Sequence, residues 1–413
     1  MTTETKGAGI ANTIFYCATN VVLFDPGAFV PNYVRVLREA LDRQGASVRV
    51  ITSAPLFDPS TVPVPEGERR LFFRFLDHPL GRWLKSRTLL RQIYKGLSYP
   101  AGLLRTWKLL RDENPGVFHS QWLLLPAADR LLLGALRRRG WRIVVTIHDL
   151  PRFSGVVTPS WGLAGALRMA HAVHVHSPGL AKRLTGECGL DGTPIEVIPQ
   201  PAEILDLITP EERLAARRQF GLPDDKPVAL FFGLIKPYKG LDLLIDALPD
   251  LLRDVPDARI VIAGEPMMPI EDLREQARQA AGDRVLWRLG YIPKSEVRTY
   301  FAAADLLACP YHDISASGVS GLAVSHGVPV LATSVGAFPE LIEDGVTGWL
   351  VPPEDPAALA GVLARALSDR TAMAEVGRQG REHLLERARA DHVAGAWLRL
   401  YESLSTDRSL GRT

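Results

Sequence analysis

The chain has 413 residues and a formal net charge of +2, with 46% hydrophobic and 23% charged residues. This is an ordinary globular composition, and the balanced charge gives no indication of nucleic-acid binding. No apolar run reaches the roughly 18–20 residues of a membrane span. The N-terminal residues have no hydrophobic signal core, and three scattered cysteines predict free thiols in a reducing cytosol. We therefore expect a cytoplasmic protein with two domains, because the length exceeds one typical core.

The first half alternates short apolar strands with amphipathic helices. The predicted strands are Thr13–Cys17, Val48–Ile51, Val117–Ser120, Ile143–Ile147, Val173–His176 and Ile195–Ile198. Helices are predicted between them, for example over Asn32–Arg43 and Ala127–Arg138. Such alternation indicates βαβ units and a parallel sheet.

The second half repeats this rhythm after a segment with three prolines, Pro199–Pro210, which we predict to be a linker. The predicted strands are Val228–Phe232, Arg259–Ala263, Arg284–Leu286, Leu306–Ala308, Pro329–Ala332 and Gly348–Val351. The sequence therefore predicts an α/β protein of two Rossmann-like domains whose parallel sheets face each other across a cleft. Ligands of such sheets bind at the carboxyl ends of the strands, and clefts between domains are common ligand sites.

Two turns in the second half have the composition of anion sites. Gly233 follows a strand, and Lys236 and Lys239 precede a helix that begins at Leu241. Glycine lets the backbone approach a ligand, a helix N-terminus attracts anions, and lysines add point charges for a diphosphate. The turn Ser317–Val319 also precedes a helix, so its backbone N–H groups could bind phosphate oxygens. A solvated surface loop is the alternative for the lysine turn.

The order of the glycine-containing segments is more specific than any one of them. G-x-x-x-x-x-K-G is followed by A-G-E-P, G-Y-I-P, S-G-V, G-x-P-V-x-A-T and G-x-x-P-E within Val228–Leu367. This series resembles the nucleotide-sugar-binding domain of the family-4 retaining glycosyltransferases, which have the GT-B fold. The first half is similar only in its rhythm and at a few positions.

The resemblance implies a role for each part of the chain. Residues 1–203 would form the acceptor-binding domain and residues 204–386 the donor-binding domain. Residues 387–413 would cross back to the first domain, with an amphipathic helix over Asp391–Leu404 whose aromatic residues pack rather than bind ligand.

The resemblance also implies donor-binding residues. Lys239 corresponds to the lysine that contacts the donor diphosphate. The arginine that usually follows Gly233 is replaced by Leu234, so Lys236 is expected to supply that charge, as in a subgroup with the motif F-F-G-x-I-R-P-Y-K-G. Tyr291 and Ile292 correspond to the segment beside the nucleobase.

Two family glutamates are missing. Their positions are occupied by Ile314 and Leu322, which cannot bind a sugar through a polar side chain. Asp313 is the candidate to replace the first glutamate, or else a capping residue of the loop. The turn Ser317, Gly318 and Val319 is kept. Glu265, after a strand end, could face the cleft, or else be a helix-start carboxylate.

The candidate site residues of the first half are histidines and one glycine. His148 ends a strand in a segment that resembles T-x-H-x-L of the family, whose histidine lies next to the donor sugar. His119 is a weaker candidate of the same kind. His174 and His176 alternate on one strand, where packing or a strand-end hydrogen bond is favoured over a metal pair. Gly27 lies in a loop that approaches the phosphates in the family, although D-P-G also forms ordinary turns.

The resemblance implies a retaining reaction with attack from the face of the leaving diphosphate. Lys236 and Lys239 would stabilise the departing diphosphate, His148 and Asp313 would position the reacting sugar and acceptor, and the donor would be a UDP- or GDP-sugar. No Asp-x-Asp motif is present, and no cofactor or essential metal is expected. The alternatives are a nucleotide-sugar epimerase and a catalytically silent binding subunit.

Residues 69–111 are basic, with eleven Lys or Arg, one acidic residue and interleaved aromatic residues. Such segments are typical of contact with anionic membranes. A peripheral position at the inner membrane face would suit a lipid-linked saccharide acceptor, besides a glycan or a small molecule. The alternative is a solvated helix pair that lines the acceptor side, and no motif supports nucleic acid.

Overall fold

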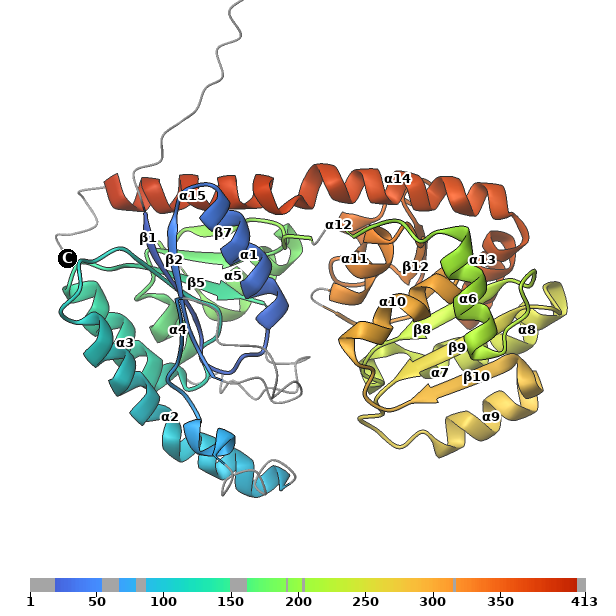
Figure 1. The fold of residues 1–413 in the computed structure, drawn as a ribbon, viewed down its shortest axis with the longest axis horizontal. Coiled ribbons are helices and arrows are strands. Elements are labelled where there is room, and N and C mark those ends of the chain that lie inside the picture. The colour runs from blue at the N-terminus through green and yellow to red at the C-terminus, as the bar shows by residue number, and fades with distance from the viewer. Residues whose placement is uncertain are drawn as a thin grey trace, which may run out of the picture.

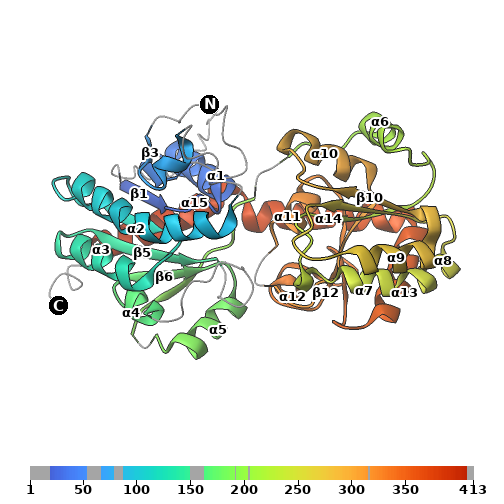
Figure 2. The same ribbon diagram turned by 90° about the horizontal axis from the view of Figure 1, so that it is seen from below.

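The computed structural model describes residues 19–53, 67–78, 87–148, 162–190, 192–202, 205–314 and 317–406. These residues form two lobes, each built on a parallel sheet, that lie side by side (Figures 1 and 2). The predicted α/β architecture of two Rossmann-like domains is therefore confirmed. In the part of the chain described, none of the helices combines the length and apolar character that a membrane crossing requires.

The sheet of the first lobe has the strand order β3-β2-β1-β4-β5-β6-β7, and all neighbours pair in parallel. Its strands are β1 Asn20–Asp25, β2 Ser47–Thr52, β3 Glu68–Arg70, β4 Val117–Ser120, β5 Arg142–Ile147, β6 Ala172–Val175 and β7 Ile195–Val197. The central strand β1 was not among the predicted strands, and the predicted strand Thr13–Cys17 lies outside the described residues.

Helices cover both faces of this sheet. They are α1 Pro31–Arg43, the short η1 Arg74–Asp77, α2 Thr88–Leu110, α3 Pro126–Arg138, α4 Leu163–Leu167 and α5 Pro178–Cys188. Alternate residues of β1 point to opposite faces: Val22 and Phe24 pack with α2 to α5, while Val21 and Leu23 pack with α1 and the last helix of the chain.

The second lobe repeats the arrangement with the order β10-β9-β8-β11-β12-β13, again parallel throughout. Its strands are β8 Val228–Phe232, β9 Arg259–Gly264, β10 Val285–Leu289, β11 Leu306–Cys309, β12 Val330–Thr333 and β13 Trp349–Val351. This is the strand order of dinucleotide-binding domains, in which the order of successive strands across the sheet reverses beside the first strand.

Two hydrophobic clusters fill the space between this sheet and its helices. The helices are α6 Pro210–Phe220, η3 Pro237–Lys239, α7 Leu241–Asp246, α8 Leu248–Asp254, α9 Glu271–Ala281, η4 Gly282–Arg284, α10 Lys294–Ala303, α11 Gly318–Ser325, α12 Phe338–Leu341 and α13 Pro356–Ser368. One cluster packs α7, α8, α9 and α13 on one face, and the other packs α6, α10 and α11 on the opposite face.

The chain crosses between the lobes twice. The first crossing runs from β7 to α6, and the second joins α14 Arg370–Ala388 to α15 Ala390–Thr406, which extend along both lobes in Figure 1. The two crossings meet where the Ala202 N–H donates to the Ala388 carbonyl at 2.8 Å. The apolar side chains of α15 recur at helical spacing and are buried against the first lobe, with Trp397 and Tyr401 fully buried. The last helix therefore completes the first lobe, as the family resemblance implied.

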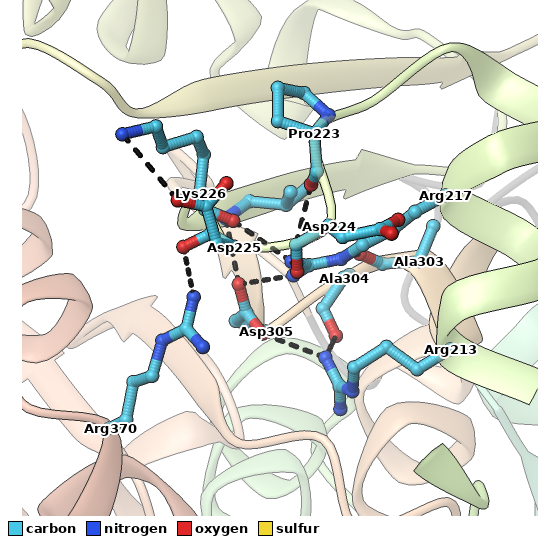
Figure 3. A network of polar contacts seen from close by, with 11 residues as sticks. Arg213, Arg217, Pro223, Asp224, Asp225, Lys226, Ala303, Ala304, Asp305 and Arg370 are labelled. Atoms are coloured by element: carbon cyan, nitrogen blue, oxygen red, sulfur yellow. Dashed lines mark hydrogen bonds and ion pairs between the residues drawn. The ribbon is translucent and has the colours of Figure 1, made fainter. Parts of the chain in front are cut away.

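A buried ion pair fixes the end of the second sheet where β11 begins (Figure 3). Arg217 of α6 is 1% exposed and pairs with Asp305 at 2.7 Å. It also donates to the carbonyls of Ala303, Asp224 and Lys226. Because this is the amino-terminal edge of the strands, the network braces the fold at the edge opposite to that expected for ligands.

Candidate active site

The predicted donor and acceptor residues lie in loops at the carboxyl ends of the strands. In each sheet the strand order reverses between two neighbouring strands, β1 and β4 in the first lobe and β8 and β11 in the second. Ligands of doubly wound sheets bind outside the carboxyl ends at such a reversal. The loops after these four strands are therefore the candidate site.

Two glycines bring the loops after β8 and β9 together. Gly264 has a φ of +145°, and a Cβ on it would lie 1.9 Å from the Gly233 carbonyl oxygen. Only glycine permits this approach. The Ile235 N–H then donates to the Glu265 carbonyl at 2.9 Å, so the half-buried Glu265 is held beside the lysine loop.

Lys239 is a buried cation without an anionic partner. Its side chain is 7% exposed, and its Nζ lies 3.1 Å from the position that a Cβ on Gly233 would occupy. Burial lowers the pKa of Lys239 to about 8; Cys309 opposes the shift and the charge of Lys236 adds to it. No carboxylate among the described residues forms an ion pair with it. Since a buried charge needs a counter-charge, this lysine is suited to hold an anion.

Lys236 and Leu234 flank the same turn. Lys236 immediately precedes η3, is half-buried, and its Nζ lies 5.9 Å from the centroid of the Tyr238 ring. Leu234, which takes the place of the family arginine, is exposed. The charge of Lys236 contributes to the lowered pKa of Lys239. Lys236 is therefore the candidate to replace the charge of the family arginine.

The turn before α11 meets the lysine loop. Ser317 caps the helix by accepting from the Ser320 N–H at 3.3 Å. The N–H groups of Gly318 and Val319 lie in the first helical turn, where no intrahelical acceptor exists. A Val319 methyl group lies 3.4 Å from the position of a Cβ on Gly233. Lys239 and the start of α11 thus converge on one point beside Gly233.

The two positions that lack the family glutamates are packing positions. Ile314 is buried in the cluster that joins α10 and α11, and Leu322 packs against the same cluster. A Cβ on Gly336 would lie 1.5 Å from the Ile314 carbonyl oxygen, so the loop is fixed against its neighbour. Asp313 is half-buried on this loop. Neither apolar side chain can replace a carboxylate.

The loop after β11 is also fixed by an ion-pair cluster. His312 Nε2 lies 3.0 Å from Asp242 of α7, and its Nδ1 bonds to Glu354. Burial alone would lower the pKa of His312, but the two carboxylates together raise it. His312 therefore links the helix after the lysine turn to the Asp313 loop.

Tyr291 and Ile292 have different environments although they are adjacent. Tyr291 follows β10 and is 54% exposed, whereas Ile292 packs against the cluster around α10. Tyr291 is therefore the more exposed of the two, and Ile292 is largely a packing residue.

His148 lies after β5 in a group of aromatic residues. Its Nε2 lies 3.1 Å from Gln121 Oε1 and its Nδ1 2.9 Å from His176 Nε2. Trp122 stacks on its ring at 5.2 Å and 22°. Burial lowers the pKa of His148 well below its usual value, and His176 and His119 add to this effect. His148 is therefore neutral.

The other histidines form a chain of hydrogen bonds that crosses the sheet to α15. His174 donates from Nε2 to the Ile198 carbonyl at 2.8 Å, which leaves Nδ1 to accept from Thr146 at 3.0 Å. Thr146 in turn accepts from His119 at 2.7 Å, and His119 accepts from Tyr401 at 2.8 Å. His119 therefore belongs to this chain and is fully buried, so it is not a ligand-facing residue.

The loop after β1 contains Gly27, whose Cβ position is covered by the Phe29 ring at 2.2 Å. Asp25, the last residue of β1, accepts from the Phe29 and Val30 N–H groups at 3.3 Å. Burial raises the pKa of Asp25 to about 6, against the lowering effect of these bonds. Sequence reasoning missed Asp25, although a polar residue that ends a buried strand is a detectable signal.

The two lobes contact each other near these loops. Glu340 at α12 accepts from the Gly179 N–H at the start of α5 at 2.7 Å, and Lys294 Nζ lies 3.4 Å from Asn32. No group of three or more His, Cys, Asp or Glu in the described residues has the geometry to hold a metal ion.

The sequence of the chain is similar to families of known enzymes. Residues 30–204 match the family described as Glycosyltransferase Family 4, and residues 226–369 match Glycosyl transferases group 1. The chain is 30% identical to a D-inositol 3-phosphate glycosyltransferase of Xylanimonas cellulosilytica, over 91% of the chain and 92% of that protein. A protein of the same name from Mycolicibacterium smegmatis is also 30% identical, over 91% and 86%.

Several solved structures share the two-lobed fold. Sucrose-phosphate synthase of Thermosynechococcus elongatus superposes with a TM-score of 0.70 at 22% identity, over 94% of this chain and 99% of that one. Anabaena HepE in complex with UDP-glucose gives 0.66 at 17% identity, over 93% and 100%. The fold is therefore the GT-B fold. The family match and the relatives in sequence show that the protein is an enzyme that transfers glycosyl groups.

The chain belongs to the family-4 (group 1) glycosyltransferases.

Proposed function

We propose that the protein is a retaining, metal-independent transferase that moves a sugar from a UDP- or GDP-sugar to a hydroxyl group of the acceptor. The observation that carries this proposal is Lys239, a buried cation with no ion-pair partner in the described residues, next to Gly233 and the start of α11. A diphosphate would supply the missing negative charge. The relation to Anabaena HepE, which was solved with UDP-glucose, favours UDP-sugars as the first donors to test.

In the proposed reaction the acceptor oxygen attacks the anomeric carbon on the face from which the diphosphate leaves. The bond from this carbon to the phosphate oxygen breaks, and the acceptor proton passes to that oxygen. Lys239, Lys236 and the N–H groups of Gly318 and Val319 stabilise the departing charge. His148 and Asp313 position the sugar and the acceptor, and Glu265 and Tyr291 bind the donor.

Nucleotide release from a panel of UDP- and GDP-sugars tests this function. We expect the nucleotide to be released and an α-linked donor to give an α-linked glycoside, which proton NMR detects. EDTA should not change the rate of release. Interconversion of sugars without release would mean an epimerase. Activity that is abolished by EDTA and restored by manganese would contradict metal independence.

We also propose that α2 contacts anionic membranes. Leu89, Ile93, Leu97 and Leu104 are exposed, with Leu97 at 78%, and their spacing places them on one face of the helix. From Thr88 to Leu110 the helix has basic but no acidic residues. Apolar side chains beside cations suit the headgroup region of an anionic bilayer.

Sedimentation with liposomes tests this contact. The protein is expected to pellet with vesicles that contain phosphatidylglycerol but not with pure phosphatidylcholine. The double variant Ile93→Glu and Leu97→Glu should bind at least about tenfold more weakly, because two apolar contacts are lost. Leu131→Glu on α3 is the matched control, since Leu131 is 74% exposed on another helix. Equal binding to both lipids would refute the proposal.

A further inference from the structure

A tyrosine ring lies beside the buried lysine of the second lobe. The Nζ of Lys239 lies over the ring of Tyr311, 5.4 Å from the ring centroid, within the range of cation–π attraction. Tyr311 is in the loop after β11 and is 2% exposed, while Lys239 is 7% exposed. Both groups are therefore shielded from water, and a desolvated cation–π pair is stronger than one at the surface.

The Tyr311 ring is fixed by its neighbours. Phe338 of α12 packs against it with the ring centroids 5.5 Å apart, and Tyr238 of η3 meets it edge-on at 6.4 Å. The carbonyl of Tyr311 accepts a hydrogen bond from the Thr333 hydroxyl at the end of β12. Because both the backbone and the ring are held, the ring is a rigid support for the ammonium group of Lys239.

The hydroxyl end of the same side chain lies next to the turn before α11. Burial raises the pKa of the Tyr311 phenol well above its usual value, and a hydrogen bond with Ser317, the N-cap of α11, opposes this rise. Tyr311 therefore contacts both elements that converge beside Gly233, which are the lysine turn and the start of α11.

A neutral ring suits this lysine better than a carboxylate would. A carboxylate would offset the cost of burying the charge, but it would also neutralise the lysine and repel a diphosphate. An aromatic ring attracts the ammonium group through its quadrupole and carries no net charge. Burial lowers the pKa of Lys239 to about 8, so the lysine remains mostly protonated at neutral pH and its charge stays available to an anion.

We propose that Tyr311 is a positioning residue of the transferase, whose ring holds the ammonium group of Lys239 at the point where the donor diphosphate binds, without neutralising it. The inference rests on the proposed function, because the diphosphate is the ligand assigned there to Lys239. Tyr311 acts through the lysine, so its contribution disappears when the positive charge of Lys239 is removed by substitution or by deprotonation.

Unfolding of the full chain without nucleotide measures the attraction itself. The Tyr311→Leu substitution should lower the denaturant midpoint more in the wild-type chain than in a Lys239→Met chain, because only the first loses a cation–π contact. At about pH 9.5 the two losses should be equal, since Lys239 is then neutral. Tyr311→Met is a second variant without a ring, for use if the leucine variant does not fold.

Isothermal titration with UDP and GDP measures the consequence for the site. Tyr311→Leu and Tyr311→Met should bind the nucleotide at least about tenfold more weakly than the wild type, because the ammonium group is no longer held in place. Tyr311→Phe keeps the ring and should bind within about threefold of the wild type. In the Lys239→Met chain, Tyr311→Leu should change the affinity by less than about twofold.

Phe220→Leu is the matched control for the loss of a buried ring below a cation. Phe220 is 9% exposed at the end of α6, and the guanidinium of Arg288 lies over its ring at 5.2 Å. This ring lies before β8 begins, at the edge of the sheet opposite to the lysine turn. The control variant should unfold at a lower denaturant concentration but keep the nucleotide affinity of the wild type.

Three results would overturn the inference. The first is an unchanged nucleotide affinity in Tyr311→Leu and Tyr311→Met, and the second is an equal loss in Tyr311→Phe. The third is a loss that stays the same in the Lys239→Met chain or at high pH, because the ring would then support the fold and not the lysine. If the wild type binds neither nucleotide, the proposed donor chemistry fails, and the unfolding measurements alone decide whether the ring holds the lysine.

Discussion

The Lys239→Met variant is expected to turn over nucleotide sugars roughly 100 to 1,000 times more slowly than the wild type. This is the loss that follows removal of one preorganised group that stabilises charge in a dry site. Lys239 is buried and has no ion-pair partner among the described residues, so in the proposed reaction its charge would act on the diphosphate. Initial rates of nucleotide release measure the effect. Lys226→Met is the control, because Lys226 pairs with Asp257 away from the site.

The same substitution should not weaken the fold. A lysine whose pKa is lowered to about 8 is less readily charged when folded than when unfolded, so its burial opposes folding at neutral pH. The variant should therefore melt at the same or a higher temperature. Nucleotide affinity of the wild type should fall as the pH rises through about 8, and the variant should lack this dependence. Full activity in the variant would refute the role of Lys239.

The Arg217→Met variant is expected to lower the free energy of unfolding by about 3–5 kcal/mol, as breaking a buried ion pair does. The substitution removes one of the positive charges that balance the Asp305 carboxylate. It also removes the hydrogen-bond donor to the carbonyls of Ala303, Asp224 and Lys226. Denaturant unfolding followed by circular dichroism measures the loss.

The neighbouring residue provides a matched control for this substitution. Arg218 is on the same helix, 72% exposed, and 3.5 Å from Asp224. The Arg218→Met variant should change the free energy of unfolding by less than about 1 kcal/mol, since exposed ion pairs contribute little. If both variants unfold at the same denaturant concentration as the wild type, the buried network does not brace the sheet.

The strand–helix rhythm was sufficient to predict the architecture, because buried parallel strands are apolar runs separated by helices. The strand β1 was not predicted, because its apolar run follows closely after another apolar run, Thr13–Cys17. Periodicity alone does not show which of the two runs forms the strand. The position of α15 on the first lobe was predictable only through the family resemblance, as its apolar stripe does not specify a partner.

The packing of the loops in the candidate site was predictable where backbone geometry limits the residue. Gly233 and Gly264 are required by a close approach of two loops, which the motif order already indicated. The surroundings of His148 were not predictable, because Gln121 and Tyr33 reach it from separate segments that only the sheet order brings together.

The position of α15 has a consequence for biosynthesis. One face of the first lobe's sheet, with Val21 and Leu23 of its central strand, is covered by α1 and by Trp397 and Leu398 of the last helix. During translation all strands of this sheet are synthesised long before residues 390–406 emerge from the ribosome. The first lobe therefore cannot finish folding as the chain grows, although N-terminal domains usually fold first. Chains that end before α15 should expose the apolar face of this sheet, and they should therefore depend on chaperones to avoid aggregation.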